Sequence, residues 1–303
     1  MPDELVTEIA ELGRDRHSGA SSLATRAMHL LLRAETEGLL VTAAAALCRA
    51  QPTMAPVWNA SLAALADRER PGTLERFRVR LERAPAALER YAVGALVPDP
   101  ARPVRLVTLS ASGTVLATVR ALTRHVTVHV SCGEGRPGHE GREMAAALAA
   151  AGAAVTLCTD AALGSGIDAA DAVLVGADAV GAAAVLNKTG TRMLAAAAGS
   201  CGVPVYVIAT GDKLAMPALW RHLSIRTGAP AEVWEEPPPG VQVVNPYFEA
   251  TPLDLVTAVF TDSGVLGVDM VPAACAALET DPARRGLDEL LRAFDARRTN
   301  PPS

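Results

Sequence analysis

The feature that most constrains the fold is a change of pattern near residue 98. Before it, apolar residues recur at helical spacing, and nothing alternates with the two-residue period of a half-buried strand. After it, short runs rich in Val and Leu alternate with segments of helical length. We expect buried parallel strands at residues 104–109, 126–130, 154–157, 172–175 and 205–209. Strand–helix alternation of this kind predicts a doubly wound parallel sheet.

The predicted fold class is therefore α/β, in two domains. We expect a helical N-terminal domain at residues 1–98 and a Rossmann-like, mainly parallel sheet domain at residues 99–303, joined by a proline-rich connection. Half of the residues are hydrophobic but only 3% are aromatic, so the core must be built from Ala, Val and Leu. Small side chains of this kind suit helices packed tightly against a sheet.

Composition excludes several classes of function. A net charge of −5 argues against a direct nucleic-acid partner held by a basic surface. The first 19 residues are acidic and amphipathic, unlike a signal peptide, and the apolar stretches are too interrupted to predict a membrane span. The five cysteines are scattered without a CxxC pair, which predicts neither disulfides nor a metal site. Without a signal peptide, a membrane span or a disulfide framework, we expect a cytoplasmic protein. No GxGxxG follows an expected strand, so we expect no dinucleotide cofactor.

Small hydroxyl residues follow the first expected strand, in the sequence TLSASG at residues 108–113. Ser110 and Ser112 precede an expected helix, where free N–H groups can bind an anion. Either serine can equally serve only as the N-cap of that helix. Both interpretations stay open from the sequence.

A glycine-rich loop, SCGEGRPG at residues 131–138, follows the second expected strand. Its Glu134 and Arg136 are two residues apart. They can face one ligand together, or they can pair with each other at the surface, and the spacing does not decide between the two.

The sharpest signal follows the fourth expected strand. Asp178 lies at the mouth of a buried sheet among apolar residues, where a carboxyl pKa tends to rise into the range of a general acid. Asn187 and Lys188 precede a helix and offer amide donors, a cation and the helix dipole to a phosphate. The alternative is that Asp178 caps a turn and Lys188 is solvated. Lys213, after the fifth strand, adds a cation at the same edge.

These residues also carry a family resemblance. The sequence from VLVGADAV through LNKTGTRMLA to VPVYVIAT resembles the superfamily that unites methylthioribose-1-phosphate isomerase, ribose-1,5-bisphosphate isomerase and the α, β and δ subunits of eukaryotic initiation factor 2B. The preceding segment, GRPGHEGREMAAALAAAGAAVTLCTDAALG, is similar to the region where those proteins carry an acid, an Arg or Gln, and a Pro. FEATPLDLVTAVFTDSGVL is similar to the family's C-terminal signature, and GASSLATRAM, from Gly19, resembles its N-terminal glycine motif.

The resemblance implies a helical domain over a Rossmann-like domain, which forms a homodimer or a higher homo-oligomer. It also implies a site between the domains for a phosphorylated pentose or a related nucleotide, with Gly19 and Ala20 in the glycine motif. The isomerases interconvert a 1-phosphorylated aldose with its ketose, and they use a cysteine after the first strand and an aspartate after the fourth as an acid/base pair. The aspartate matches Asp178, and the family's substrate-binding Asn-Lys pair matches Asn187 and Lys188.

Three positions depart from the isomerases. The family's cysteine falls on Ser110, and its phosphate-binding arginines fall on Ser18 and Gln51. A serine hydroxyl is a poor base without a partner. Each lost charge-assisted contact costs about 1.5–3 kcal/mol, which disfavours tight binding of a doubly phosphorylated sugar. Cys132 can supply a thiol from one strand away, or it can be a buried core residue.

Two functions therefore remain from the sequence. The first is an aldose–ketose sugar-phosphate isomerase, or an enzyme-derived ligand binder, that uses Asp178 with Ser110 in place of the cysteine. The second is a non-catalytic regulatory or sensing subunit related to initiation factor 2B. Retention of Asp178, Asn187 and Lys188 favours the first, and loss of the thiol and arginines favours the second.

Overall fold

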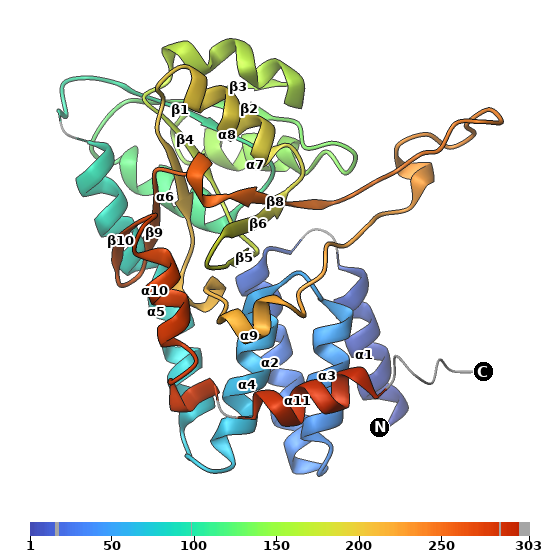
Figure 1. The fold of residues 1–303 in the computed structure, drawn as a ribbon. Helices are drawn as coiled ribbons and strands as arrows, with labels where there is room; N and C mark the ends of the chain where they lie inside the picture. Colours follow the sequence, from blue (N-terminus) through green and yellow to red (C-terminus); the bar gives the residue numbers. More distant parts are fainter. Residues whose placement is uncertain (16–17, 98, 285, 297–303) are drawn as a thin grey trace.

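The computed structural model describes residues 1–15, 18–97, 99–284 and 286–296, and it has a helical region packed against a sheet-containing region (Figure 1). The first third of the chain is helical, as predicted. Its helices are α1 (Asp3–Arg14), α2 (Ala20–Thr36), α3 (Leu40–Ala50), α4 (Ala55–Asp67) and α5 (Thr73–Leu96).

Helix α4 is the centre of the helical region. Twelve of its thirteen residues are buried, and most of them are Ala or Leu, which allows neighbouring helix axes to come close. Trp58 of α4 packs against Phe294 with 4.9 Å between the ring centroids. Phe294 belongs to α11 (Leu287–Asp295), so the last described helix lies with the first four (Figure 1). The domain boundary near residue 98 stays a prediction, and Pro98 lies outside the described residues.

The described part of the chain contains a mostly parallel seven-stranded sheet. The strand order is β10-β9-β7-β4-β1-β2-β3, and only β10 runs antiparallel to its neighbour. The strands are β1 (Val104–Thr108), β2 (Val128–Gly133), β3 (Ala154–Cys158), β4 (Ala172–Val175), β7 (Val205–Ile208), β9 (Ala258–Thr261) and β10 (Gly264–Gly267). Strand order reverses between β1 and β4, and ligands of such sheets bind outside the carboxyl ends of the strands at this switch point.

Helices cover both faces of this sheet, which confirms the doubly wound α/β fold. One face packs on α5, α6 (Gly113–Leu122) and α7 (Glu140–Ala150). The other packs on the 3-10 helix η1 (Asp160–Ala169), α8 (Thr191–Ser200) and α10 (Val271–Ala277). A strand covered on both faces reads as a continuous apolar run, and all four residues of β4 are buried.

The expected strands are all present, with one shifted start. β2 begins at Val128 rather than 126, because the Val126 amide still donates to Leu122 O at the end of α6. The sequence did not reveal β9 and β10, nor a small antiparallel sheet of β5 (Ala179–Val180), β6 (Ala184–Lys188) and β8 (Phe248–Pro252). β6 pairs with β8 more than 60 residues away in the chain, a pairing that no local pattern encodes.

Candidate functional site

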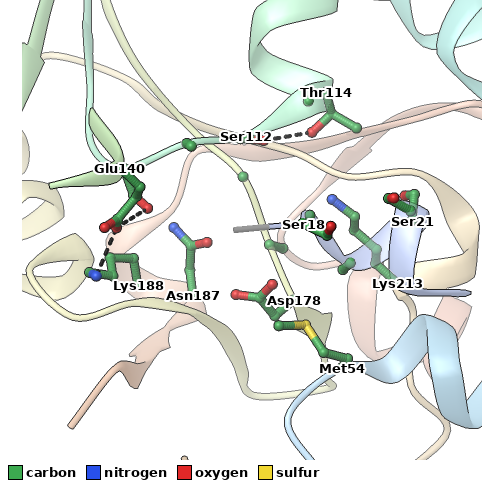
Figure 2. A pocket seen from close by; sticks show the side chains of 18 of the residues that line it. Ser18, Ser21, Met54, Ser112, Thr114, Glu140, Asp178, Asn187, Lys188 and Lys213 are labelled. Carbon is green, nitrogen blue, oxygen red and sulfur yellow. Dashed lines mark hydrogen bonds and ion pairs between the residues drawn. The ribbon is translucent and has the colours of Figure 1, made fainter. Parts of the chain in front are cut away.

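A cavity of about 440 Å³ lies between the N-terminal helices and the carboxyl edge of the sheet, at the β1/β4 switch point. It is lined by most of the residues that the sequence singles out: Gly19, Ala20, Ser110, Asp178, Asn187, Lys188 and Lys213. Ser18, Gln51, Glu140, Arg226 and Tyr247 line it as well. Segments far apart in the sequence therefore converge on one space (Figure 2).

The backbone of Asp178 is fixed from two sides. Its N–H donates to Leu186 O in β6 at 2.8 Å, and its carbonyl accepts from Ala55 N at the start of α4 at 3.0 Å. The side chain faces the cavity and accepts no hydrogen bond from any residue that the structure describes, so it does not cap a turn (Figure 2). Desolvation by the surrounding protein raises the pKa of Asp178 to about 6, and the positive charges of Lys213 and Lys188 offset part of that rise.

Lys188 is buried and ion-paired rather than solvated. It is 6% exposed, and its Nζ lies 2.7 Å from Glu140 Oε1 and 5.3 Å from the centre of the Tyr247 ring. Its neighbour Asn187 is also buried and donates through Nδ2 to Thr191 Oγ1 at 3.0 Å. Asn187 and Lys188 thus belong to the cavity wall, and the cation of Lys188 already has a carboxylate partner.

Lys213 is a second buried cation, at the end of the 3-10 helix η2 (Gly211–Lys213) that follows β7. Burial lowers the pKa of Lys213, while the negative charges of Asp212 and Asp178 act in the opposite direction. Among the described residues no carboxylate lies within 4 Å of its Nζ. Lys213 is therefore better placed than Lys188 to bind an anion that enters the cavity.

The two serines after β1 have different partners. Ser112 is the N-cap of α6: its Oγ accepts from Val115 N at 3.4 Å. Gly176, after β4, allows this close approach, because a Cβ there would lie 2.5 Å from Ser112 Oγ. Ser110 does not cap the helix but donates to Glu140 Oε1 at 2.7 Å. The sequence reasoning missed Glu140, although it lies within the segment that carries the resemblance.

Glu134 and Arg136 do not line the cavity. Glu134 pairs with Arg142 at 3.1 Å and with His139 at 3.2 Å. The backbone N–H of Arg136 donates to Asp160 Oδ2 at 2.7 Å, and its side chain is exposed. The loop residues that do border the cavity follow them, at Gly138 and Glu140.

The start of α2 points into the cavity. Gly19 is the N-cap residue, and no side chain of the described residues caps this end of the 17-residue helix. Ser18, Ser21 and Ser22 line the same wall, with Ser18 N held by Asp15 Oδ1 at 2.9 Å. Uncapped N–H groups and hydroxyls at a helix N-terminus form a binding place for phosphate.

An arginine that the sequence reasoning missed lines the cavity near Gln51, where the resemblance expects an arginine. Gln51 is buried and donates to Leu12 O at 2.6 Å, while its Oε1 accepts from Arg226 at 3.3 Å. Arg226 also donates to Gly13 O. It immediately precedes Thr227, which forms an antiparallel bridge with Pro246. The segment between these two bridge residues forms an arm that extends away from the rest of the molecule (Figure 1). Gln51 and Arg226 are 175 positions apart in the chain, which explains why no sequence motif pointed to this contact.

Cys132 is a core residue. It is fully buried, its Sγ contacts Gly133 O and Gly141 O at 3.6 Å, and burial raises the pKa of its thiol to about 12. Within the described ranges, no group of three or more His, Cys, Asp or Glu side chains could hold a metal ion. No helix among those residues is long and apolar enough to span a membrane.

The amino-acid sequence is similar to those of known proteins. The family model "Initiation factor 2 subunit family" matches residues 19–267. The methylthioribose-1-phosphate isomerase of Desulforudis audaxviator is 36% identical over 187 residues, which cover 56% of this chain and 54% of that protein. The ribose 1,5-bisphosphate isomerase of Archaeoglobus fulgidus is 35% identical over 150 residues, 47% of each chain. This chain thus spans about half the length of the curated relatives that it matches.

Solved structures share the fold over a larger part of the chain. The translation initiation factor eIF-2B of Pyrococcus horikoshii superposes with a TM-score of 0.74 at 24% identity, covering 88% of this chain and 98% of that one. The 5-methylthioribose 1-phosphate isomerase of the same organism gives 0.64 at 23% identity, covering 95% and 87%. Both similarities concern the fold.

Proposed function

The chain belongs to the initiation factor 2 subunit family, and we propose that its cavity binds a phosphorylated pentose or a related nucleotide and interconverts a 1-phosphorylated aldose with its ketose. The observation that carries the proposal is Asp178, a carboxyl group with a pKa raised to about 6 that faces the cavity between Lys213 and Asn187 (Figure 2). A carboxyl with such a pKa can give and take a proton near neutral pH.

The phosphate of the ligand is expected at the α2 side of the cavity. There Ser18 and Ser21 lie on the same side as Lys213 (Figure 2). Gly19, the N-cap of α2 without a side-chain cap, follows Ser18 and lines the cavity as well. Arg226, held by Gln51, supplies a guanidinium from outside the family's motif. These donors replace in part the two arginines that the isomerases carry.

The charged residues of the described cavity lining show no excess of cations for a second phosphate. Among the described residues, three acids and three bases line it: Asp15, Glu140, Asp178, Lys188, Lys213 and Arg226. If all are ionised, their charges cancel. A second phosphate would add a dianion without a matching cation, which costs free energy in a partly desolvated site.

Two relatives are named as isomerases of 1-phosphorylated pentoses, and this supports the same class of reaction here. In the proposed reaction Asp178 is the general acid and Ser110 occupies the place of the family's cysteine. We propose further that the protein is a cytoplasmic homodimer or higher homo-oligomer, which light scattering of the purified protein would test.

The second candidate is a non-catalytic sensing subunit. Two observations favour it: a serine stands at the cysteine position, and Lys188 is engaged by Glu140. A sensor would bind a phosphosugar or nucleoside monophosphate without converting it.

Calorimetric titration separates the candidates. Methylthioribose 1-phosphate, ribose 1,5-bisphosphate, ribose 5-phosphate and nucleoside monophosphates are titrated into the wild type and Asp178→Asn, with the exposed Asp254→Asn as the control. Turnover is followed by NMR. The isomerase proposal expects binding by both and turnover lost only in Asp178→Asn. Binding without turnover in the wild type selects the sensor, and absence of binding by every ligand contradicts both.

A further inference from the structure

Glu140 and Lys188 lie at the side of the cavity opposite the proposed phosphate end (Figure 2). With Ser110, which donates to Glu140, they form a contact cluster. Glu140 Oε1 accepts a hydrogen bond from Ser110 Oγ and an ion-pair contact from Lys188 Nζ, both at 2.7 Å. Within the described residues Oε2 accepts no hydrogen bond from a side chain or a backbone N–H. One carboxylate oxygen is thus held from two sides, while the other lies against the loop, where Cβ atoms at Gly138 and Gly135 would lie 3.0 and 3.1 Å from it. Glu140 lines the cavity with this carboxylate.

The backbone around this contact is unusual. Among the described non-glycine residues, positive φ angles occur at Ser110 (66°) and His139 (59°). The first is the donor to Glu140, and the second immediately precedes Glu140. A non-glycine residue in the left-handed region costs on the order of 1 kcal/mol and persists where the surroundings impose it, often at functional sites. Both strained residues therefore serve the same side-chain contact.

Close packing fixes Glu140 further. A Cβ at Gly141 would lie 1.8 Å from Gly133 O, so only glycine lets the start of α7 approach the end of β2 this closely. A Cβ at Gly135 would lie 2.8 Å from the Glu140 carboxyl carbon, so the loop lies directly on the carboxylate. These contacts leave Glu140 little freedom to turn away from the cavity.

We propose that Glu140 is the catalytic base of the reaction and takes the place of the missing thiol, with Ser110 and Lys188 as the groups that position its carboxylate. This inference rests on the proposed isomerase function. A serine hydroxyl alone is a poor base, whereas a carboxyl group is one of the side chains that accept a proton from a substrate in general-base catalysis. The cluster supplies the partner that the serine lacks.

The proposed step balances with the chain's own groups. Asp178 gives its proton to the ring oxygen as the bond between C1 and that oxygen breaks. Glu140 takes the proton from C2, whose bonding electrons form the C1–C2 double bond of an enol, and then returns the proton to C1. The C2 hydroxyl gives its proton back to Asp178 as C2=O forms. Both carboxyl groups end in their starting states, and substrate and product are isomers.

The test measures binding, turnover and pH profile in four variants of the full chain, with methylthioribose 1-phosphate as the probe. Glu140→Gln should lose at least a hundredfold in kcat while its Kd changes less than threefold. Glu143→Gln, on the exposed side of the same helix, should match the wild type. Ser110→Ala should lose about tenfold, because it removes one of two contacts that position the carboxylate. These sizes follow the usual range for general-base catalysis.

The double variant Ser110→Cys with Glu140→Gln best distinguishes a role of Glu140 as base from a merely structural role. A thiol at position 110 can act as base without the carboxylate, so this variant should recover at least tenfold over Glu140→Gln. Its activity should rise at a higher pH than that of the wild type, because a thiol titrates near 8.5. A merely structural role of Glu140 would give neither the recovery nor the shifted profile.

Three results overturn the inference. The inference is wrong if Glu140→Gln retains more than a tenth of the wild-type kcat, or if Ser110→Ala lowers kcat more than Glu140→Gln does. If the wild type binds the ligand but does not convert it, the role of Glu140 as base is also wrong, although the binding proposal stands. If the wild type converts the ligand and Glu140→Gln converts it as well, the isomerase proposal stands and only the role of Glu140 as base is rejected.

Discussion

Asp178→Asn is expected to stabilise the protein at neutral pH while it abolishes turnover. Burial raises the pKa of Asp178 from an ordinary value of 3.8 to about 6. Below about pH 3.8 the carboxyl is protonated in both the native and the unfolded state, and its contribution to stability is fully present. Between 3.8 and 6 the native state keeps a proton that the unfolded chain releases, so stability falls as the pH rises through this window.

The size of the effect follows from the shift. About two pKa units at roughly 1.36 kcal/mol each amount to about 3 kcal/mol lost above pH 6. The amide of Asn has the same shape and does not ionise, so the variant avoids this loss. Lys213 then loses one of the two acidic neighbours that favour its charged form, which reduces the gain. We therefore expect Asp178→Asn to be more stable than the wild type by about 1–2 kcal/mol at pH 7.5.

Urea unfolding followed by tryptophan fluorescence, at several pH values from 4.5 to 8, measures the difference. The gap between variant and wild type should be small at pH 4.5 and should widen up to pH 7. Asp254→Asn, at an exposed aspartate, should show no such change with pH. A gap that is constant with pH, or a variant less stable than the wild type at pH 7.5, would refute the assigned burial and pKa of Asp178.

Three further changes test the site and the fold. Lys213→Ala should weaken binding of a phosphosugar by roughly ten- to a hundredfold in titration calorimetry. Lys188→Ala should weaken it less, because the ammonium group of Lys188 is already ion-paired with Glu140. Arg226→Ala should weaken the same ligand about tenfold or more, whereas Arg221→Ala, at an exposed arginine of the same segment, should not. Phe294→Ala should lower the free energy of unfolding by about 3–5 kcal/mol in urea titration, because it leaves a cavity against Trp58.

The sequence was sufficient for the parts of the fold that local patterns encode. Helical periodicity predicted the N-terminal helices, and strand–helix alternation predicted β1, β2, β3, β4 and β7 with small errors at their ends. Because the carboxyl ends of parallel strands share one edge, polar residues after different strands were expected to meet. Ser110, Asp178 and Lys213 do line one cavity.

The features that the sequence missed depend on contacts between distant segments. The pairing of β6 with β8 and the packing of α11 against α3 each join parts of the chain with no common motif. The sequence pointed to Glu134 and Arg136 in the glycine-rich loop, whereas the acid that lines the cavity is Glu140, at the start of α7. Backbone strain at Ser110 is likewise invisible in a serine-containing motif.

When this chain is compared with the isomerases one sequence position at a time, functional groups are counted as lost even where the fold brings a similar group to the same place. At the cysteine position stands a serine, yet that serine contacts the carboxylate of Glu140, 30 residues away. At one arginine position stands a glutamine, yet that glutamine contacts the guanidinium of Arg226, 175 residues away. In both places the substituted residue contacts a side chain that lines the cavity: the carboxylate of Glu140 in the first, the guanidinium of Arg226 in the second. The comparison with the isomerases should therefore use the pairs that meet in space, Ser110 with Glu140 and Gln51 with Arg226. Compared in this way, the cavity lining carries two carboxyl groups, Asp178 and Glu140, and besides Lys188 the cations of Lys213 and Arg226.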